Sequence, residues 1–283
     1  MKIYLINLDR SPQRLNVIRR RLKEQGLGFE RLAAVDGQKL SEEECQSYTH
    51  YPPSFTKSVA EYTRKYGGEF FLSSQSFLHK SPLTKGEIAC FLSHRKAIKK
   101  IAEGAQAFGA VLEDDAILSS QAKNFLSSSA WIPRGVDFIK LDRSCFPCCV
   151  SKKKMPLEGG FSLHHLKSLH LSACGYIISQ RLARQIYPLL RYATISIDIL
   201  LFSPKLGLAS SYKVMQLYPA VIEQNFFPKN SIIDKERQQR KKQKLSLLQI
   251  LRRETERLEF KHGLWLRLRY WPKAIWGQIP WKP

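Results

Sequence analysis

Apolar residues at the start of the chain form short continuous runs separated by a stretch with helical spacing. Residues 2–8 are such a run and predict a buried strand. Ser11 and Pro12 predict the start of a helix, because serine caps a first turn and proline suits its first position, and Gly26 predicts the helix end. Residues 29–35 predict a second strand, so the chain opens with a strand–helix–strand unit.

Two capping boxes predict further helix starts in the next part of the chain. Ser41 precedes Glu44 by three positions, and Thr84 precedes Glu87 by the same spacing. Residues 50–83 lie between these starts and are rich in proline, glycine and serine, so they predict a long loop.

Three further apolar runs continue the alternation of strands and helices. They predict strands at residues 107–112, 136–141 and 172–179, with helices after the later ones. This alternation predicts an α/β fold with a mostly parallel central sheet. The chain has 283 residues, of which 43% are hydrophobic and 25% charged, and this is the composition of a globular protein with a sizeable core.

The formal net charge of +22 is the unusual part of the composition. Such a chain attracts polyanions, which include nucleic acid, anionic lipid and phosphorylated substrates. Residues 229–283 contain 15 lysines and arginines against 5 acids, and four of the five tryptophans. We therefore expect a C-terminal appendage of distinct composition.

Cysteine usage and the N-terminus indicate a reducing compartment. Of the six cysteines, Cys145, Cys148 and Cys149 form a cluster, but a second CxxC pair that would complete a zinc site is missing from the sequence. The apolar run at residues 2–8 is too short for a signal peptide, and no stretch reaches the roughly 18 apolar residues of a membrane span. These features predict a cytoplasmic protein with structural thiols.

An acidic triplet is the strongest chemical feature of the sequence. Glu113, Asp114 and Asp115 follow an apolar strand, and ligands of open α/β sheets bind beyond the carboxyl ends of strands. Three adjacent carboxylates repel one another, and Mg²⁺ or Mn²⁺ relieves that repulsion while bridging to substrate phosphates. The triplet is equally compatible with an acidic surface turn.

Six stretches of the chain carry a resemblance to a known family. In order they are residues 3–15, 29–37, 83–98, 110–118, 172–183 and 218–225. Together they resemble glycosyltransferase family 25, which includes bacterial lipooligosaccharide galactosyltransferases and glucosyltransferases. The resemblance implies a catalytic domain at residues 1–231, and the basic, tryptophan-rich segment 232–283, which we expect to be helical, lies outside it.

The resemblance implies a GT-A-like nucleotide-binding fold and an inverting, metal-assisted transfer from a UDP-sugar. The sugar implied is a hexose, galactose first and glucose second, and the acceptor is a lipooligosaccharide or lipopolysaccharide core glycan. Asp115, and then Asp114, match the motif that holds Mn²⁺ or Mg²⁺. The residues that match the family's donor site are Asn7, Asp9, Arg10, Arg14, Ser93, His94, Glu113, Gln224 and Asn225.

An inverting transfer also needs a general base for the acceptor hydroxyl. Asp198 lies within the apolar residues 195–200, where desolvation raises a carboxyl pKa and favours proton acceptance, and the family often carries an aspartate at this place. The tryptophan that usually stands beside it is missing here. Asp142 is the second candidate, and a buried structural acid or a helix cap is the alternative for Asp198.

The C-terminal segment suggests where the protein works. Residues 235–244 are a basic block, residues 245–260 have the spacing of an amphipathic helix, and residues 263–276 interleave tryptophan with lysine and arginine. This composition is typical of contact with an anionic membrane surface, here the inner face of the cytoplasmic membrane. A helix pair packed on the catalytic domain is the alternative.

Two other functions are compatible with the charge or with the fold. The first is nucleic-acid binding, which we do not expect because the sequence has no nucleic-acid-binding motif. The second is sugar-nucleotide binding without catalysis, and the intact acidic triplet argues against it.

Overall fold

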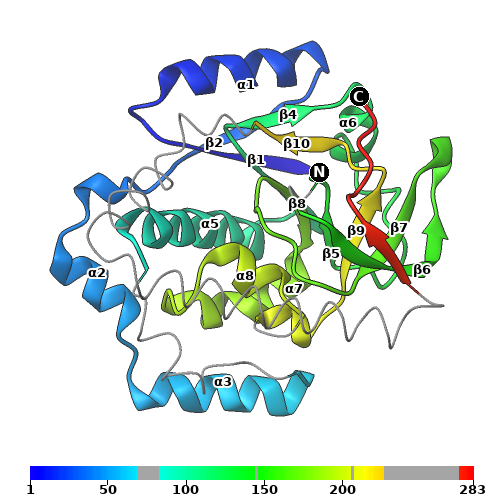
Figure 1. Cartoon of the computed structure of the whole chain (residues 1–283). Helices are drawn as coiled ribbons and strands as arrows, with labels where there is room; N and C mark the ends of the chain where they lie inside the picture. The colour runs from blue at the N-terminus through cyan, green and yellow to red at the C-terminus, as the bar shows by residue number, and fades with distance from the viewer. Residues whose placement is uncertain (69–82, 144–145, 205–206, 226–273) are drawn as a thin grey trace.

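A mixed β-sheet between two layers of helices forms the body of the protein (Figure 1). The computed structural model describes residues 1–68, 83–143, 146–204, 207–225 and 274–283. Within these residues the main sheet has nine strands and a second sheet has two. In spatial order the main sheet consists of β11 (Ala274–Gly277), β6 (Cys148–Pro156), β7 (Ser162–Leu166), β9 (Val214–Tyr218), β5 (Phe138–Lys140), β8 (Gly175–Ser179), β3 (Phe108–Glu113), β1 (Lys2–Asn7) and β2 (Glu30–Ala33). The second sheet pairs β4 (Ala116–Leu118) with β10 (Ile222–Gln224).

The strand directions confirm the predicted α/β class and show that the sheet is mixed. β2, β1 and β3 are parallel neighbours, and β5 is parallel to β9. β8 runs antiparallel between β3 and β5, and β7 runs antiparallel between β6 and β9. The short connection between β6 and β7 allows only an antiparallel pair, since a parallel pair needs a long crossover. The parallel arrangement expected from the sequence is thus interrupted by returning strands.

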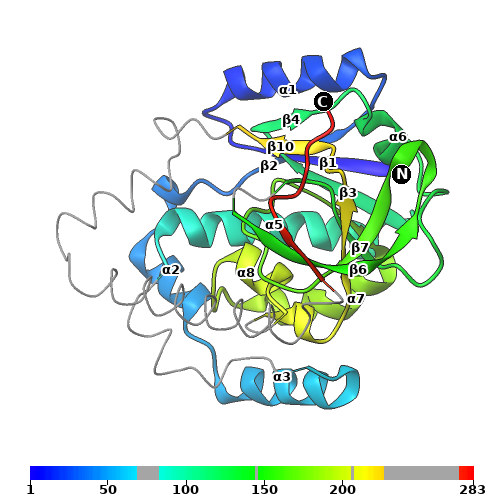
Figure 2. The same ribbon diagram turned by 45° about the vertical axis from the view of Figure 1, so that its right-hand side comes forward.

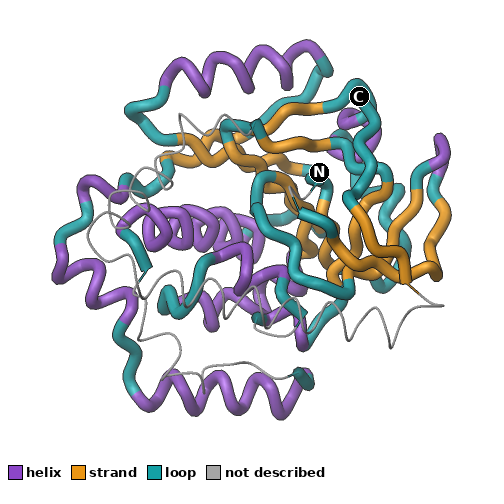
Figure 3. The backbone as a smooth tube through the Cα atoms, in the orientation of Figure 1, coloured by secondary structure: helices purple, strands orange, loops and turns teal. Residues whose placement is uncertain are grey.

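The sheet divides the hydrophobic core into two parts because side chains alternate across a strand. In β1, Tyr4 and Ile6 belong to one core and Ile3 and Leu5 to the other. The helices lie on both faces of the sheet (Figure 3). One face carries α1 (Pro12–Glu24) and α6 (Ala122–Leu126), and the other carries α5 (Lys85–Glu103), α7 (Gln180–Ile186) and α8 (Ile197–Phe202). Short 3-10 helices are η1 (Gly37–Lys39), η2 (Glu158–Gly160), η3 (Tyr187–Arg191) and η4 (Leu208–Ser210).

Helix α5 is the central helix of its layer and lies against β2, β1 and β3 (Figures 1 and 2). The predicted capping box forms its start, because the Thr84 hydroxyl accepts from the Glu87 amide at 3.1 Å and the Glu87 carboxylate accepts from the Thr84 amide at 2.8 Å. At the other end of the helix, a side chain at Gly109 of β3 would clash with Ile101, since a Cβ there would lie 2.5 Å from it. The glycine therefore lets helix and strand approach closely.

The prediction of a long loop at residues 50–83 is wrong for the first part of this range. Helix α3 (Pro53–Tyr66) follows α2 (Glu42–Thr49), which begins at the predicted capping box. Proline is tolerated in the first turn of a helix, so the Pro52–Pro53 pair that suggested a loop instead starts α3. Its buried face is formed by residues at helical spacing, Phe55, Val59 and Tyr62. Residues 69–82 lie outside the described part of the chain.

The end of the predicted appendage belongs to the main sheet. β11 pairs with β6 and forms one edge of the sheet, and Ile279 is 2% exposed within the larger core. The Ala220 amide donates to Pro280 O at 2.9 Å, and the Lys282 amide donates back to Ala220 O at 3.3 Å. The prediction that residues 232–283 are helical is wrong at residues 274–277, because these pair with β6 as strand β11, and the helix expected at residues 245–260 lies outside the described part of the chain. Among the described residues, no helix combines the length and the apolar character needed to cross a membrane.

The three-cysteine cluster is consistent with structural thiols where it can be described. Cys148 and Cys149 lie in β6 and are buried, and neither forms a disulfide. Cys145 lies outside the described residues.

We expect Ile279→Ala to lower the free energy of unfolding by about 2–5 kcal/mol, because it removes a large buried side chain from the core. Ile275 of the same segment is only partly buried, so Ile275→Ala is the matched control and should cost less. Urea unfolding of the full chain, followed by circular dichroism, measures both. Small and equal losses in the two variants would show that the end of the chain does not contribute to the core.

Candidate active site

The acidic triplet lies where three parallel strands end. β1 ends at Asn7, β2 at Ala33 and β3 at Glu113, so their carboxyl ends share one edge of the sheet. A turn at residues 114–115 then leads into β4. Since successive residues of this turn point in different directions, the three carboxylates have different partners.

Asp114 is turned toward the first strand and the helix that follows it. Its carboxylate accepts a hydrogen bond of 2.7 Å from Asn7 Nδ2 and is ion-paired with Arg14 of α1. Asn7 is itself held in place, because Nδ2 also donates to Ser11 O and Oδ1 accepts from Arg31. Burial raises the pKa of Asp114, although Arg14 favours its charged form. Asp114 is therefore engaged by the protein itself.

Glu113 is turned toward helix α5. Its Oε1 lies 3.1 Å from His94 Nε2, and the other ring nitrogen, Nδ1, lies 3.1 Å from the Tyr176 hydroxyl. Both His94 and Tyr176 are fully buried. Burial alone would raise the pKa of Glu113, but the hydrogen bond and charge of His94 outweigh it and lower this pKa. The buried Tyr176–His94 chain thus keeps the Glu113 carboxylate ionised and oriented.

Asp115 lies between Glu113 and the second sheet. Its Oδ2 accepts a hydrogen bond of 3.1 Å from Gln224 Nε2 and lies 3.1 Å from the Arg14 guanidinium. Its Oδ1 lies 3.6 Å from Cys174 Sγ. Burial and the charge of Glu113 raise the pKa of Asp115 to about 7. Of the three carboxylates, Asp115 is therefore the one whose charged form is disfavoured most.

Strand β10 brings two of the predicted donor residues, Gln224 and Asn225, to the triplet. Gln224 pairs with Ala116 of β4, and the Asn225 amide donates to Asp115 O at 3.0 Å. Ala220, which is bonded to the chain's C-terminal residues, lies just before this strand. The end of the chain is thereby connected to the acidic turn through β10.

The structure contains a ligand set that fits a divalent cation. One ligand atom from each of Glu113, Asp115 and Cys174 lies within 4.8 Å of the other two. Carboxylate oxygens suit Mg²⁺ or Mn²⁺, and a cation would relieve the repulsion that raises the pKa of Asp115. Glu113 and Asp115 form the pair here, whereas Asp114 faces Arg14 and Asn7, so Asp114 as second ligand stays a prediction.

Asp9 and Arg10, two of the predicted donor residues, border the edge of the sheet. Asp9 is largely exposed, and its Oδ1 lies 2.5 Å from Arg31 Nη2. This pairing lowers the pKa of Asp9. Arg10 Nε donates to Asp36 Oδ2 at 2.8 Å in the loop after β2. Both residues therefore hold the loops around the triplet, and they do not touch its carboxylates.

Ser93, another predicted donor residue, is buried beneath the loop after β2. Its hydroxyl accepts from the Val35 amide at 2.9 Å and donates to Ala89 O at 2.7 Å. In the same loop, a Cβ on Gly37 would lie 2.8 Å from Lys85 O at the start of α5. Ser93 thus positions the loop against α5, while its helix neighbour His94 reaches the triplet.

The two candidates for the general base have different environments. Asp142 is fully buried, and its Oδ1 lies 2.6 Å from Nζ of the equally buried Lys140. Burial raises the pKa of Asp142 in spite of the Lys140 charge. Asp198 is only partly buried, in the first turn of α8, and its Oδ1 accepts from the Ile199 amide at 2.9 Å. Of the two, Asp198 is the carboxylate that a substrate can approach.

Ser172 connects the two candidate bases. Its hydroxyl donates to Asp142 Oδ2 at 3.0 Å, and its amide donates to Asp198 Oδ2 at 3.3 Å. Ser172 has a φ of +91°, which is strained for a residue with a side chain. The hydrogen bonds to Asp142 and Asp198 hold it in that conformation, so Asp142 positions Asp198 through Ser172.

Several residues of the site were not predicted from the sequence. Cys174 and Ser172 lie in the loop before β8, and Cys90 lies beside Glu113. Two weak signals were present: Cys90 and His94 are four positions apart and so share a helix face, and Lys140 interrupts an apolar strand.

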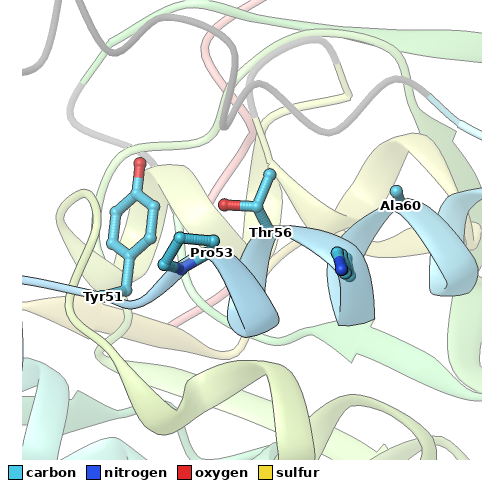
Figure 4. Close-up of a pocket in the computed structure, with 5 residues that line it drawn as sticks. Tyr51, Pro53, Thr56 and Ala60 are labelled. Atoms are coloured by element: carbon cyan, nitrogen blue, oxygen red, sulfur yellow. The ribbon is translucent and has the colours of Figure 1, made fainter.

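A surface groove lies apart from these residues. It has a volume of about 410 Å³ and lies along the start of α3 (Figure 4). The Tyr51 ring at its edge packs against Phe55 and Tyr192, with centroid distances of 5.5 and 6.2 Å. The described lining contains none of the predicted catalytic, donor or metal residues and consists of Tyr51, Pro53, Thr56, Lys57 and Ala60.

The α/β fold, with acidic residues at the carboxyl edge of its sheet, is compatible with the family that the sequence motifs indicate, and a family model tests that resemblance. The model of glycosyltransferase family 25, described as an LPS biosynthesis protein, matches residues 1–201, more than half of the chain. The chain therefore belongs to glycosyltransferase family 25, as its motifs predict. The match includes the acidic triplet, both candidate bases and all predicted donor residues except Gln224 and Asn225.

Curated relatives include bacterial proteins that are named for lipooligosaccharide biosynthesis. The chain is 32% identical over 176 residues to lipooligosaccharide biosynthesis protein lex-1 of Haemophilus influenzae, covering 56% of this chain and 58% of the relative. It is 28% identical to lacto-N-neotetraose biosynthesis glycosyltransferase LgtE of Neisseria meningitidis, with coverages of 58% and 65%. It is 27% identical to lipooligosaccharide biosynthesis protein lic2B of Haemophilus influenzae, with coverages of 78% and 79%. The chain thus spans less than two thirds of the length of lex-1 and LgtE.

The raised pKa of Asp115 predicts that this residue destabilises the metal-free protein at neutral pH. Between its ordinary pKa of 3.8 and the folded value of about 7, the folded state binds a proton that the unfolded chain has released, so stability falls as the pH rises. We expect Asp115→Asn to remove this loss. Its free energy of unfolding relative to the parent should therefore be more favourable at pH 8 than at pH 4.

Urea unfolding in the presence of a chelator measures this difference. Asp9→Asn is the matched control, because the pairing with Arg31 lowers the pKa of Asp9 and its replacement should not gain stability as the pH rises. An Asp115→Asn difference that is the same at both pH values would contradict the assignment.

Proposed function

We propose that this chain is an inverting, metal-assisted glycosyltransferase that moves a hexose from a UDP-sugar to a lipooligosaccharide or lipopolysaccharide core glycan. Galactose is the sugar that we favour, and glucose is the second. The observation that carries the proposal is the convergence of Glu113 and Asp115 at the carboxyl ends of parallel strands, where burial and the charge of Glu113 raise the pKa of Asp115 to about 7. The divalent cation that accompanies a nucleotide diphosphate supplies the positive charge that this pair lacks.

The family and the relatives support the reaction class and the acceptor class. The family is one of glycosyltransferases, and lex-1 and lic2B are named as lipooligosaccharide biosynthesis proteins. The β1–α1–β2 unit, with the acidic turn at its carboxyl edge, supports the GT-A-like assignment because such an edge is where nucleotides bind in open α/β sheets.

The protein's own residues prepare the donor end of the site. Glu113 and Asp115 would hold Mn²⁺ or Mg²⁺, which when bound neutralises the departing diphosphate. His94 orients Glu113, and Gln224 orients Asp115. Arg14 is partly exposed and ion-paired to Asp115, which supports the proposal that its guanidinium binds phosphate oxygens of the donor in bidentate fashion.

Asp198 has the position of the general base at the acceptor end. Its carboxylate accepts the proton of the acceptor hydroxyl, while hydrogen bonds from Ser172 and Ile199 fix the carboxylate in place. Asp142 and Lys140 remain a buried pair below it and hold Ser172 in its strained conformation. We therefore assign Asp142 a positioning role.

The glycolipid acceptor implies work at a membrane surface. We propose a cytoplasmic protein that binds peripherally at the inner face of the cytoplasmic membrane through the basic block at residues 235–244. These residues lie outside the described part of the chain. Because residues 274–283 belong to the main sheet, the block lies in a long connection between β10 and β11.

The donor reaction is tested with purified protein, Mn²⁺ and a truncated lipooligosaccharide acceptor. UDP should be released from UDP-galactose faster than from UDP-glucose. Glu113→Gln and Asp115→Asn keep side-chain volume but remove charge, and each should lower the rate at least about 10²-fold. Glu158→Gln, at an exposed carboxylate of η2, should have no effect. Full turnover in excess chelator, or a near-normal rate for Asp115→Asn, would contradict the proposal.

Substitutions of the two aspartates at the proposed acceptor end should have different effects, one on kcat and the other on stability. Asp198→Asn should lower kcat at least about 10²-fold and leave donor affinity nearly intact, because proton transfer belongs to the transition state. Asp142→Asn should instead lower the free energy of unfolding by about 3–5 kcal/mol, since it leaves Lys140 buried without its partner. Steady-state kinetics and urea unfolding separate these effects. If Asp198→Asn weakens donor binding at unchanged kcat, Asp198 is not the base.

Membrane binding is tested by charge substitution, since a truncation would also remove β11 and Ile279 from the fold. Replacing the lysines and arginines of residues 235–244 by glutamine should abolish co-sedimentation with anionic liposomes at low salt, at about 1 kcal/mol per charge removed. The matched control also removes six charges, by replacing exposed cations of α1 and β6: Arg19, Arg20, Lys23, Lys152, Lys153 and Lys154. Equal loss in both variants would show that net charge alone, and not this block, drives binding.

A further inference from the structure

A second group of metal-ligating atoms surrounds Glu113 on its helix side. It consists of Cys90, His94 and Glu113, and one ligand atom from each lies within 4.8 Å of the other two. Glu113 Oε1 lies 3.9 Å from Cys90 Sγ and 3.1 Å from His94 Nε2. Ligand atoms around a tetrahedral Zn²⁺ lie roughly 3.3–3.8 Å apart, given its bond lengths to sulfur, nitrogen and oxygen. Only small side-chain shifts therefore separate this group from a zinc-binding geometry.

Two features of the fold hold this group in place before any ion binds. Cys90 and His94 are one helical turn apart on α5, so their side chains project from the same face. His94 is fully buried, and its Nδ1 is bonded to the Tyr176 hydroxyl at 3.1 Å, so Nε2 is directed at Glu113. Metal-binding histidines are oriented in the same way, by a hydrogen bond to the nitrogen that does not bind the metal.

The two groups that share Glu113 differ in chemistry. On the turn side, Glu113 and Asp115 offer two carboxylate oxygens, which suit Mg²⁺ or Mn²⁺, beside the single thiol of Cys174. On the helix side, Cys90 and His94 offer sulfur and nitrogen, which select thiophilic ions. The Glu113 carboxylate therefore lies between an oxygen-rich group and a sulfur–nitrogen group, and an ion bound on either side competes for it.

We propose that Cys90, His94 and Glu113 form a binding site for a thiophilic divalent cation such as Zn²⁺. Binding releases the Cys90 thiol proton and the His94 Nε2 proton to solvent, and the remaining imidazole proton on Nδ1 is donated to the Tyr176 hydroxyl oxygen. Because this ion takes Glu113, it withdraws a ligand from the catalytic cation site, and Zn²⁺ inhibits the enzyme. The inhibition, but not the binding site, rests on the proposed glycosyltransferase function.

Direct binding tests the site with Cd²⁺ and Zn²⁺ as probes on the full chain. Cd²⁺ should produce a thiolate-to-metal charge-transfer band, and Cys90→Ser should remove the part of that band that belongs to this site. Zn²⁺ binding measured by equilibrium dialysis should weaken at least about 10-fold in Cys90→Ser, since even outer partners of a metal site are worth 10–100-fold. Cys45→Ser, at a buried cysteine of α2, is the matched control and should leave band and affinity unchanged.

Three outcomes would overturn the site. The first is a wild-type chain without a Cd²⁺ band, and the second is a band and a Zn²⁺ affinity that are the same in Cys90→Ser. The third is loss of both in Cys174→Ser but not in Cys90→Ser, which would place the ion on the turn side with Asp115. Thermal unfolding of each variant confirms that a lost band does not reflect a lost fold.

Inhibition is measured separately, as the Zn²⁺ concentration that halves UDP release at fixed Mn²⁺. It should rise at least about 10-fold in Cys90→Ser relative to Cys45→Ser, in line with the loss of affinity. If Zn²⁺ binds through Cys90 but does not slow UDP release, the two ions do not compete for Glu113. A chain that turns over no UDP-sugar refutes the proposed function, while the Cd²⁺ band still decides the site.

Discussion

Repulsion among carboxylates that are crowded and partly buried at the end of β3 is the constraint on which the rest of the structure depends. Three adjacent acids in one turn cost stability unless each finds positive charge or hydrogen-bond donors. The protein relieves two of them internally, since Arg14 and Asn7 bind Asp114, and His94 binds Glu113. Asp115 has Arg14 and Gln224 as partners, but burial and the charge of Glu113 still raise its pKa to about 7, so its charged form is the least stabilised of the three.

The surrounding fold can be understood as the support for that turn. β1 and α1 supply Asn7 and Arg14, α5 supplies His94, and β10 supplies Gln224. β10 is preceded by Ala220, which is bonded on both sides to the last residues of the chain. The C-terminal residues therefore belong to the same fold as the acidic turn and are connected to it through Ala220 and β10.

At the proposed acceptor end, one buried acid likewise positions another acid. Asp142 is paired with Lys140 in the interior and bonds the Ser172 hydroxyl, and the Ser172 amide bonds Asp198. The strained φ of Ser172 shows that this arrangement is imposed by its neighbours and is not a local preference. A buried ion pair contributes little net stability, but it defines a single position for the groups bonded to it.

Local patterns in the sequence determined the α/β class, the helix starts at Thr84 and Ser41, and the acidic turn after β3. Each of these depends on neighbouring residues, so a short window of sequence contains the cause. Helix α3 was missed because prolines also begin helices, and the returning strands were missed because pairing partners are distant in sequence. Only the tertiary structure gave the three carboxylates different partners, because these partners come from elements up to about a hundred residues away in the sequence. The pairing of Cys90 with Glu113 and the return of the chain end to the sheet were likewise decided by long-range packing, which no local pattern records.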